Sequence, residues 1–156
     1  MSEVELILLN EGNNCTLYSI QFISNDETEY ERFYNKFKED TVLNKDLFRI
    51  VQIVDNIAEK GAFERLFRYE GKMNDSVVAL PTLSTKLRLY CLRLSDGILI
   101  LGNGGKKQSR TYEEDDELKG HVITLQKFEK LLKEGQSEGS VIITERTIET
   151  DKIFDL

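Results

Sequence analysis

The chain has 156 residues, of which 40% are hydrophobic and 31% are charged, and its formal net charge is −7. This length and balance predict one globular domain over residues 1–156 and exclude a disordered chain. The acidic total argues against a general nucleic-acid coat protein, although it is compatible with a local basic site. No apolar run approaches the roughly 20 residues of a membrane helix, and the first residues lack the basic cluster of a secretory signal. We therefore expect a cytoplasmic protein.

The cysteines and the single histidine give no sign of a metal site. Cys15 and Cys91 lie in apolar, strand-like runs, so we expect buried thiols in a reducing compartment and no disulfide framework. His121 has no cysteine near it in the sequence, which argues against a zinc site with the usual ligands. We expect neither a metal nor a cofactor.

The N-terminal third reads as two strands followed by two helices. Residues 3–9 and 15–23 alternate as strands and are separated by a turn cluster, which indicates a hairpin. Ser24 and Glu27 match a capping box, so a helix is predicted from there to about Glu39, with an aromatic stripe that we assign to the core. Asn44 is the predicted cap of a second amphipathic helix that ends at Gly61.

The central stretch, residues 86–110, predicts a hairpin with a basic exit. Residues 87–94 alternate as a half-buried strand, Ser95–Gly97 supplies a turn, and the apolar run 98–101 belongs at the centre of a sheet. The glycine-rich run 102–105 is expected to let the chain leave the sheet. Before this hairpin, residues 63–71 are ambiguous between a short helix and an edge strand, and residues 76–80 form a strand closed by Pro81.

Six basic residues and one acid lie in this central stretch of an acidic chain. They are either a solvated end of a core hairpin or a site that faces phosphate, for which lysine and arginine are the suitable side chains. Residues 111–119 hold five acids and one lysine, and we hypothesise that they lie across the cations and screen them.

The C-terminal part predicts a third helix from a cap at Thr124 to Gly135. A polar linker over residues 136–140 and a strand over residues 141–148 follow, and the final eight residues are expected to fray. The predicted fold is therefore α+β: a twisted, mainly antiparallel sheet packed against two N-terminal helices, with a third helix after the central hairpin.

The predicted order of strand, helix, helix, strands ending in a lysine pair, then helix resembles the RelE/ParE toxin superfamily. Within it, the HigB-like branch associated with phages is the most similar. In that branch a strand with an arginine and a tyrosine precedes a very apolar strand, a short loop and two lysines. Arg88 and Tyr90, the run 98–101, the loop 102–105 and the pair 106–107 match these features. The resemblance covers about residues 17–132 and leaves residues 136–156 as a C-terminal extension.

The resemblance implies a function in a toxin–antitoxin module. Many members of the superfamily cleave messenger RNA on the ribosome without a metal and are neutralised by an antitoxin protein, while the ParE branch acts on DNA gyrase. Cations stabilise the charge that develops on phosphate oxygens when the 2′-hydroxyl attacks phosphorus. The resemblance assigns three residues to catalysis, Arg88, Lys106 and Lys107, and three to RNA binding, Tyr90, Arg110 and Tyr112.

Two other classes of function remain open from the sequence. A non-catalytic interaction module can use the same scaffold and bind a protein partner through its acidic surface. A small-ligand pocket at the glycine run is the third alternative, for which the sequence indicates no ligand class. The endoribonuclease hypothesis predicts that the cationic side chains converge on one concave surface.

Overall fold

The computed structural model describes residues 2–69, 76–82, 85–107 and 115–156, and over these residues the fold is α+β, as predicted. A seven-stranded sheet has the order β3-β4-β5-β6-β2-β1-β9, in which only β2 and β6 pair in parallel. Its strands are β1 (Glu3–Glu11), β2 (Thr16–Phe22), β3 (Arg68–Tyr69), β4 (Val77–Leu80), β5 (Leu87–Ser95), β6 (Ile98–Lys106) and β9 (Ile153–Asp155). A second, small sheet pairs β7 (Ile142–Ile143) with β8 (Ile148–Glu149).

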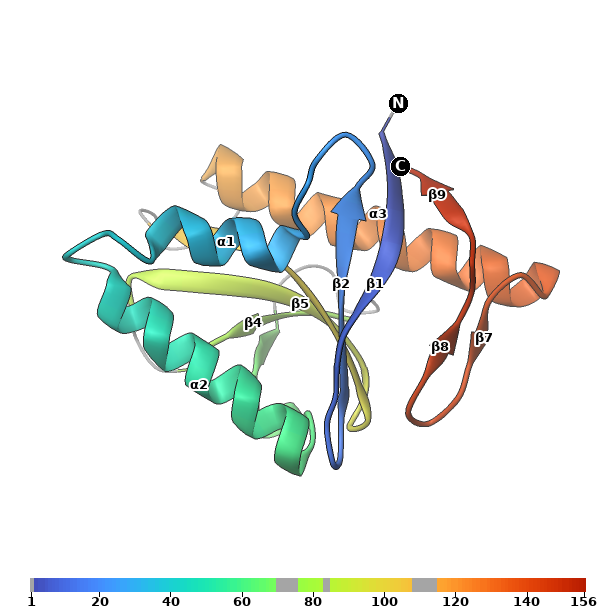
Figure 1. Cartoon of the computed structure of the whole chain (residues 1–156), viewed down its shortest axis with the longest axis horizontal. Helices are drawn as coiled ribbons and strands as arrows, with labels where there is room; N and C mark the ends of the chain where they lie inside the picture. The colour runs from blue at the N-terminus through green and yellow to red at the C-terminus, as the bar shows by residue number, and fades with distance from the viewer. Residues whose placement is uncertain (1, 70–75, 83–84, 108–114) are drawn as a thin grey trace.

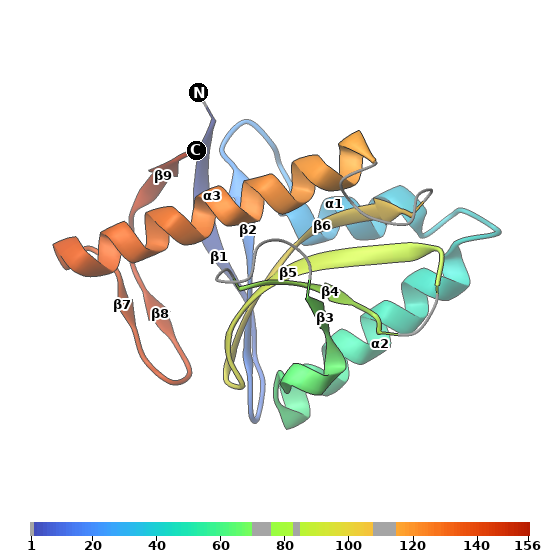
Figure 2. The same ribbon diagram turned by 180° about the vertical axis from the view of Figure 1, so that it is seen from behind.

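Helices cover both faces of the large sheet (Figures 1 and 2). Helices α1 (Glu29–Phe37) and α2 (Asn44–Lys60) lie on one face, and α3 (Asp116–Glu138) crosses the other. Alternation along β5 supplies both cores, because Leu87 and Leu89 pack with α1 and α2 while Tyr90 and Leu92 pack with α3. Residues 98–101 are fully buried between the two layers, which confirms their predicted place at the centre of the sheet.

The start of α1 differs from the prediction. Thr28, not Ser24, is the N-cap, and it forms a capping box with Glu31 in which each side chain accepts a hydrogen bond from the other residue's N–H. Both segments match the same sequence pattern. The fold favours the later one because Ser19 on β2 accepts a hydrogen bond from the N–H of Tyr30 in the first turn. The predicted aromatic stripe does belong to the core, with Phe33 and Phe37 buried.

The predicted cap of α2 is also wrong by one residue. Leu43 occupies the N-cap position without a side-chain hydrogen bond, and Asn44 is the first helical residue. The preceding turn is closed instead by Asp40, whose Oδ1 accepts hydrogen bonds from the N–H groups of Val42 and Leu43. The helix ends at Gly61, as predicted. The ambiguous segment that follows forms a 3-10 turn, η1 (Glu64–Leu66), and then the edge strand β3.

Helix α3 is longer than predicted at both ends. Its N-cap is Asp115, whose Oδ1 accepts hydrogen bonds from the N–H groups of Glu117 and Leu118, and Thr124 lies inside the helix. Gly135 is helical and buried against Val141, while the left-handed residue that ends the helix is Gly139, with φ of 86°. The linker predicted over residues 136–140 is therefore largely helical.

The C-terminus is ordered into the sheet instead of fraying. The strand predicted over residues 141–148 is a short hairpin, β7–β8, and the chain then returns as β9 to pair with β1. Phe154 is buried beneath α3 with its ring against Phe128, which anchors the last strand. The two chain ends consequently lie side by side (Figure 1), and the N–H of Leu156 donates to the carbonyl of Ser2.

The glycine run does not leave the sheet as predicted. Strand β6 continues through residues 102–105 to Lys106 and stays paired with β5, with a bulge opposite Tyr90. At Gly104 a Cβ atom would lie 1.8 Å from the carbonyl oxygen of Arg88, so the two backbones approach too closely for any side chain. This glycine therefore serves close strand packing.

Both cysteines are fully buried and unpaired, which confirms the prediction of buried thiols. Burial raises the pKa of Cys15 to about 11, and burial also raises the pKa of Cys91. Neither thiol is therefore suited to nucleophilic chemistry. Among the described helices, none has the length and apolar character needed to cross a membrane.

Candidate functional site

Two of the six predicted site residues lie in the interior. Arg88 is 3% exposed, and its Nη1 donates hydrogen bonds to both oxygens of Thr85 and to the carbonyl of Leu87. Tyr90 is 1% exposed and belongs to the core beneath α3. In this conformation neither side chain is placed to hold a phosphate or to stack on an RNA base.

Three lysines gather at the end of the β5–β6 hairpin, and we call them the lysine end: Lys86, Lys106 and Lys107. Lys106 pairs with Leu87 across the strands, and the N–H of Lys107 donates to the carbonyl of Lys86. Lys86 and Lys106 are exposed, and Lys107 is partly exposed. No carboxylate of the described residues lies within 4 Å of the ammonium group of Lys86 or Lys106.

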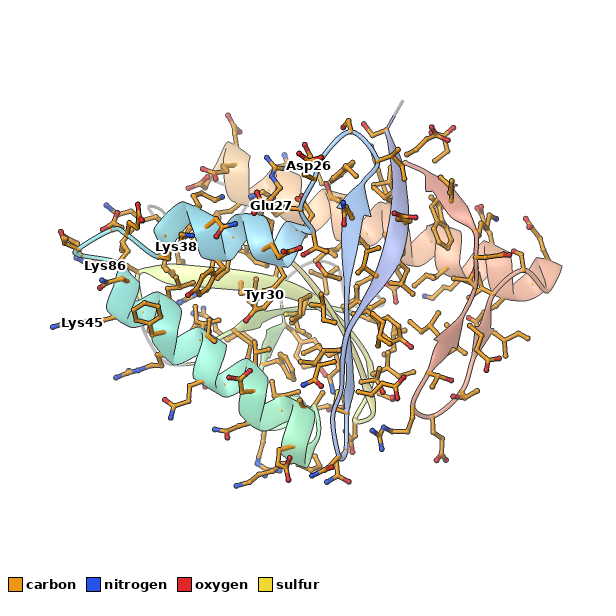
Figure 3. The ribbon with its side chains drawn as sticks, in the orientation of Figure 1. Asp26, Glu27, Tyr30, Lys38, Lys45 and Lys86 are labelled. Carbon is orange, nitrogen blue, oxygen red and sulfur yellow. The ribbon has the colours of Figure 1, made fainter. Side chains whose placement is uncertain are left out.

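The turn between α1 and α2 adjoins the lysine end. Hydrogen bonds from the N–H groups of Leu43 and Val42, together with the Lys106 ammonium, hold the pKa of Asp40 below its ordinary value. The N–H of Lys86 donates to Asp46 at the start of α2. Figure 3 shows Lys38, Lys45 and Lys86 at this same end of the molecule. The fold thus brings cations from the end of α1, from α2 and from the hairpin to one edge.

The predicted catalytic set does not converge on one surface. Lys106 lies opposite Leu87, on the face covered by α1 and α2, whereas strand alternation places Arg88 on the face covered by α3. Lys106 and Arg88 therefore lie on opposite faces of the sheet. Arg110 and Tyr112 lie outside the described residues.

A second polar group, which sequence reasoning missed, lies where β2 and β6 diverge. Residues Thr16–Ser19 of β2 pair with Ile98–Leu101 of β6. Beyond Leu101, β6 continues beside β5 alone. Side chains of α1 and α3 come from opposite faces of the sheet and contact each other at this opening. We call these polar side chains the split cluster. Its members are Glu29, Arg32 and Lys36 of α1, Asn103 of β6, and Glu117 and His121 of α3.

Contacts within the split cluster link the two helices to the glycine run of β6. The Nζ of Lys36 donates to the carbonyl of Gly104 at 2.9 Å and lies 3.0 Å from Oε1 of Glu117. That same carboxylate oxygen is 3.8 Å from Nε2 of His121. Deeper in the opening, buried Glu29 lies 3.0 Å from Nη1 of Arg32 and accepts a long, 3.4 Å hydrogen bond from Asn103.

The imidazole of His121 is held neutral by its surroundings. Its side chain is 18% exposed, and its Nε2 is buried with no hydrogen-bond partner among the described residues. Burial and the Lys36 ammonium lower the pKa of His121, with a smaller contribution from Arg32, while Glu117 and Glu29 oppose the shift. The lowered pKa favours the neutral form of the imidazole, which can accept a proton.

This environment makes the stability of the fold depend on pH through His121. Because the folded-state pKa is lowered, the unfolded chain binds a proton more readily, and stability is lost as pH falls through the unfolded value of about 6.5. We expect the melting temperature of the natural chain to fall between pH 7.5 and 5.5 more than that of His121→Asn. Equal pH slopes for the two proteins, measured by circular dichroism, would contradict this account.

One sequence signal points to the split cluster. Glu117 and His121 are four residues apart and so share a face of a helix, but the helix was predicted to start only at Thr124. Lys36 lies more than 80 residues before Glu117 in the chain, so no local sequence pattern links the two. Among the described residues no group of three or more acidic, histidine or cysteine side chains is arranged to hold a metal ion.

Comparison with known proteins leaves the chain unassigned to a family. No protein-family model, curated protein or solved structure matches it.

Proposed function

We propose that this protein is a toxin-like RNA-binding protein of a toxin–antitoxin module, with cleavage of ribosome-bound messenger RNA as its activity. The observation that carries the proposal is the lysine end, where Lys86, Lys106 and Lys107 meet at one edge beside the α1–α2 turn. Clustered ammonium groups neutralise backbone phosphates and release their counterions. The element order β2, α1, α2, β4–β6 and α3 supports it further, because it follows the order on which the resemblance to the RelE/ParE superfamily rests.

The proposal differs from the sequence-based one in the residues that contact RNA. Buried Arg88 supports the hairpin from within through Thr85, so the phosphate contacts fall to Lys106 and Lys107 with Lys86 as neighbour. A metal-independent cleavage needs a group that exchanges protons near these contacts. His121 in the split cluster is our candidate for this group, because its neutral imidazole can accept a proton and its neighbour Lys36 is anchored at Gly104, two residues before Lys106.

A second candidate is a non-catalytic module that binds a protein partner. It is favoured by the burial of Arg88 and Tyr90, which removes two of the side chains that the nuclease hypothesis required at the surface. The net charge of −7 suits a basic partner. This candidate predicts a stable complex whose affinity is unchanged when the lysine end is neutralised.

The test compares two double variants that each remove two positive charges. Lys106→Ala/Lys107→Ala alters the lysine end, and Lys127→Ala/Lys130→Ala alters exposed positions on α3 as the matched control. We expect the first pair to weaken binding of single-stranded RNA about ten-fold or more, to lower the log–log salt slope by about 2, and to relieve growth arrest on expression. The control pair should do none of these.

Two results would overturn the proposal. Harmless expression of the natural chain with unchanged messenger RNA ends would remove the toxin activity. Equal RNA affinity for both double variants would show that the lysine end does not bind RNA, and a co-purified protein retained by both would favour the interaction module.

A further inference from the structure

The split cluster holds one acidic oxygen between two nitrogen atoms that come from opposite faces of the sheet. Oε1 of Glu117 lies 3.0 Å from Nζ of Lys36 and 3.8 Å from Nε2 of His121. The Glu117 side chain is 61% exposed, whereas that of His121 is only 18% exposed. The Lys36 side chain is 34% exposed, so the carboxylate is the most exposed of the three side chains, and Nε2 of His121 is buried behind it.

We propose that Lys36 and His121 form a binding site for phosphate oxygens, which Glu117 occupies in the free protein and which an RNA phosphate takes over. This inference rests on the proposed function for the identity of the ligand as RNA. A phosphodiester shares one negative charge over two non-bridging oxygens, so it can accept from both nitrogens. The Glu117 carboxylate reaches Lys36 at hydrogen-bond distance but His121 only at 3.8 Å.

The fold supports displacement of Glu117 without loss of structure. Lys36 stays anchored by its 2.9 Å hydrogen bond to the carbonyl of Gly104, so the ammonium group keeps its position when the carboxylate leaves. Glu117 belongs to the first turn of α3, and its carboxylate lies at hydrogen-bond distance from Lys36, at 3.8 Å from Nε2 of His121 and beside Gly105 of β6. An exposed ion pair of this kind contributes little to stability, which makes it replaceable.

The electrostatics of the group favour an incoming anion at His121. Lys36 and Arg32 face it from α1 as cations, and Glu29 and Glu117 face it as anions from α1 and α3. When Glu117 moves away, one opposing negative charge is lost, and a phosphate that carries negative charge replaces it. A phosphate oxygen at hydrogen-bond distance from Nε2 acts more strongly than the carboxylate at 3.8 Å, so such a ligand raises the pKa of the imidazole.

The single histidine of the chain makes the test direct, because its NMR signal reports on this site alone. His121 is titrated between pH 5 and 8 with no ligand, with inorganic phosphate and with a short single-stranded RNA. We expect both ligands to raise its pKa in the natural protein. In Lys36→Ala neither ligand should do so, with folding of the variant checked by circular dichroism.

The carboxylate variants test the displacement itself. Glu117→Gln should bind RNA roughly two- to five-fold more tightly, the range expected when one exposed competing charge is removed. Glu134→Gln, an exposed acid farther along α3, makes the same charge change away from the site and should leave the affinity unchanged. Equal effects of the two glutamine variants would overturn the displacement.

The outcomes separate this inference from the proposed function. RNA binding that is weakened by neutralising the lysine end but leaves the His121 signal unmoved would refute the phosphate-oxygen site and keep the RNA-binding function. A response of His121 to inorganic phosphate, lost in Lys36→Ala, without any binding of RNA would keep the site and refute RNA as its ligand. No response to either ligand would refute both the site and its occupant.

Discussion

Replacement of Gly104 by alanine is expected to destabilise the fold strongly. The new Cβ would lie 1.8 Å from the carbonyl oxygen of Arg88 and 3.0 Å from Cα of Leu89, and both neighbours are backbone atoms of the central strand β5. A clash with backbone cannot be relieved by a change of rotamer, so β5 and β6 must separate. We expect a loss of about 3 kcal/mol or more in the free energy of unfolding, the upper end for overpacked sites.

The chain contains its own control for this substitution. Gly120 lies inside α3 with nothing within 4 Å of the position of a Cβ atom. Gly120→Ala should therefore stabilise the protein by about 0.5–1 kcal/mol through helix propensity alone. Urea unfolding followed by circular dichroism measures both, and equal midpoints for Gly104→Ala and the natural chain would refute the close strand packing described above.

Replacement of Arg88 by alanine is expected to act on stability and not directly on RNA contacts. The change removes a side chain that is 3% exposed and takes the Nη1 donor from the carbonyl of Leu87 in the interior and from the partly exposed oxygens of Thr85. Lost packing of the long side chain adds to this cost, and we expect a loss of about 2–4 kcal/mol in the free energy of unfolding.

The matched control is Arg49→Ala, which removes the same charge from an exposed position on α2. It should change stability by no more than about 0.5 kcal/mol. If Arg88→Ala were as stable as Arg49→Ala but had lost RNA binding at a temperature where it is folded, Arg88 would contact RNA directly. That result would restore the role first inferred from the resemblance.

The predictions that the structure confirms have a local cause. Residues 98–101 have no polar side chain, and a strand of that kind is stable only when both faces are covered, as they are here. The stripe on α1 repeats at helical spacing, so Phe33 and Phe37 had to face the core. Helix ends were less certain, because Ser24 and Thr28 each begin the same capping pattern.

The candidate site could not be predicted from local patterns. The sequence places Arg88 and Lys106 in one basic stretch, but a strand exposes its residues alternately, and only the pairing of β5 with β6 shows that they face different sides. The contact between Lys36 and Glu117 depends on two helices that approach from opposite faces where β2 leaves β6.

The sequence by itself therefore determined the α+β class, the central apolar strand and the acidic charge of the chain, because periodicity and composition are local properties. Only the tertiary structure decided which cations share a surface and what surrounds His121. The physical reason is that burial and charge pairing depend on residues that are far apart along the chain and become neighbours only when the sheet and helices assemble.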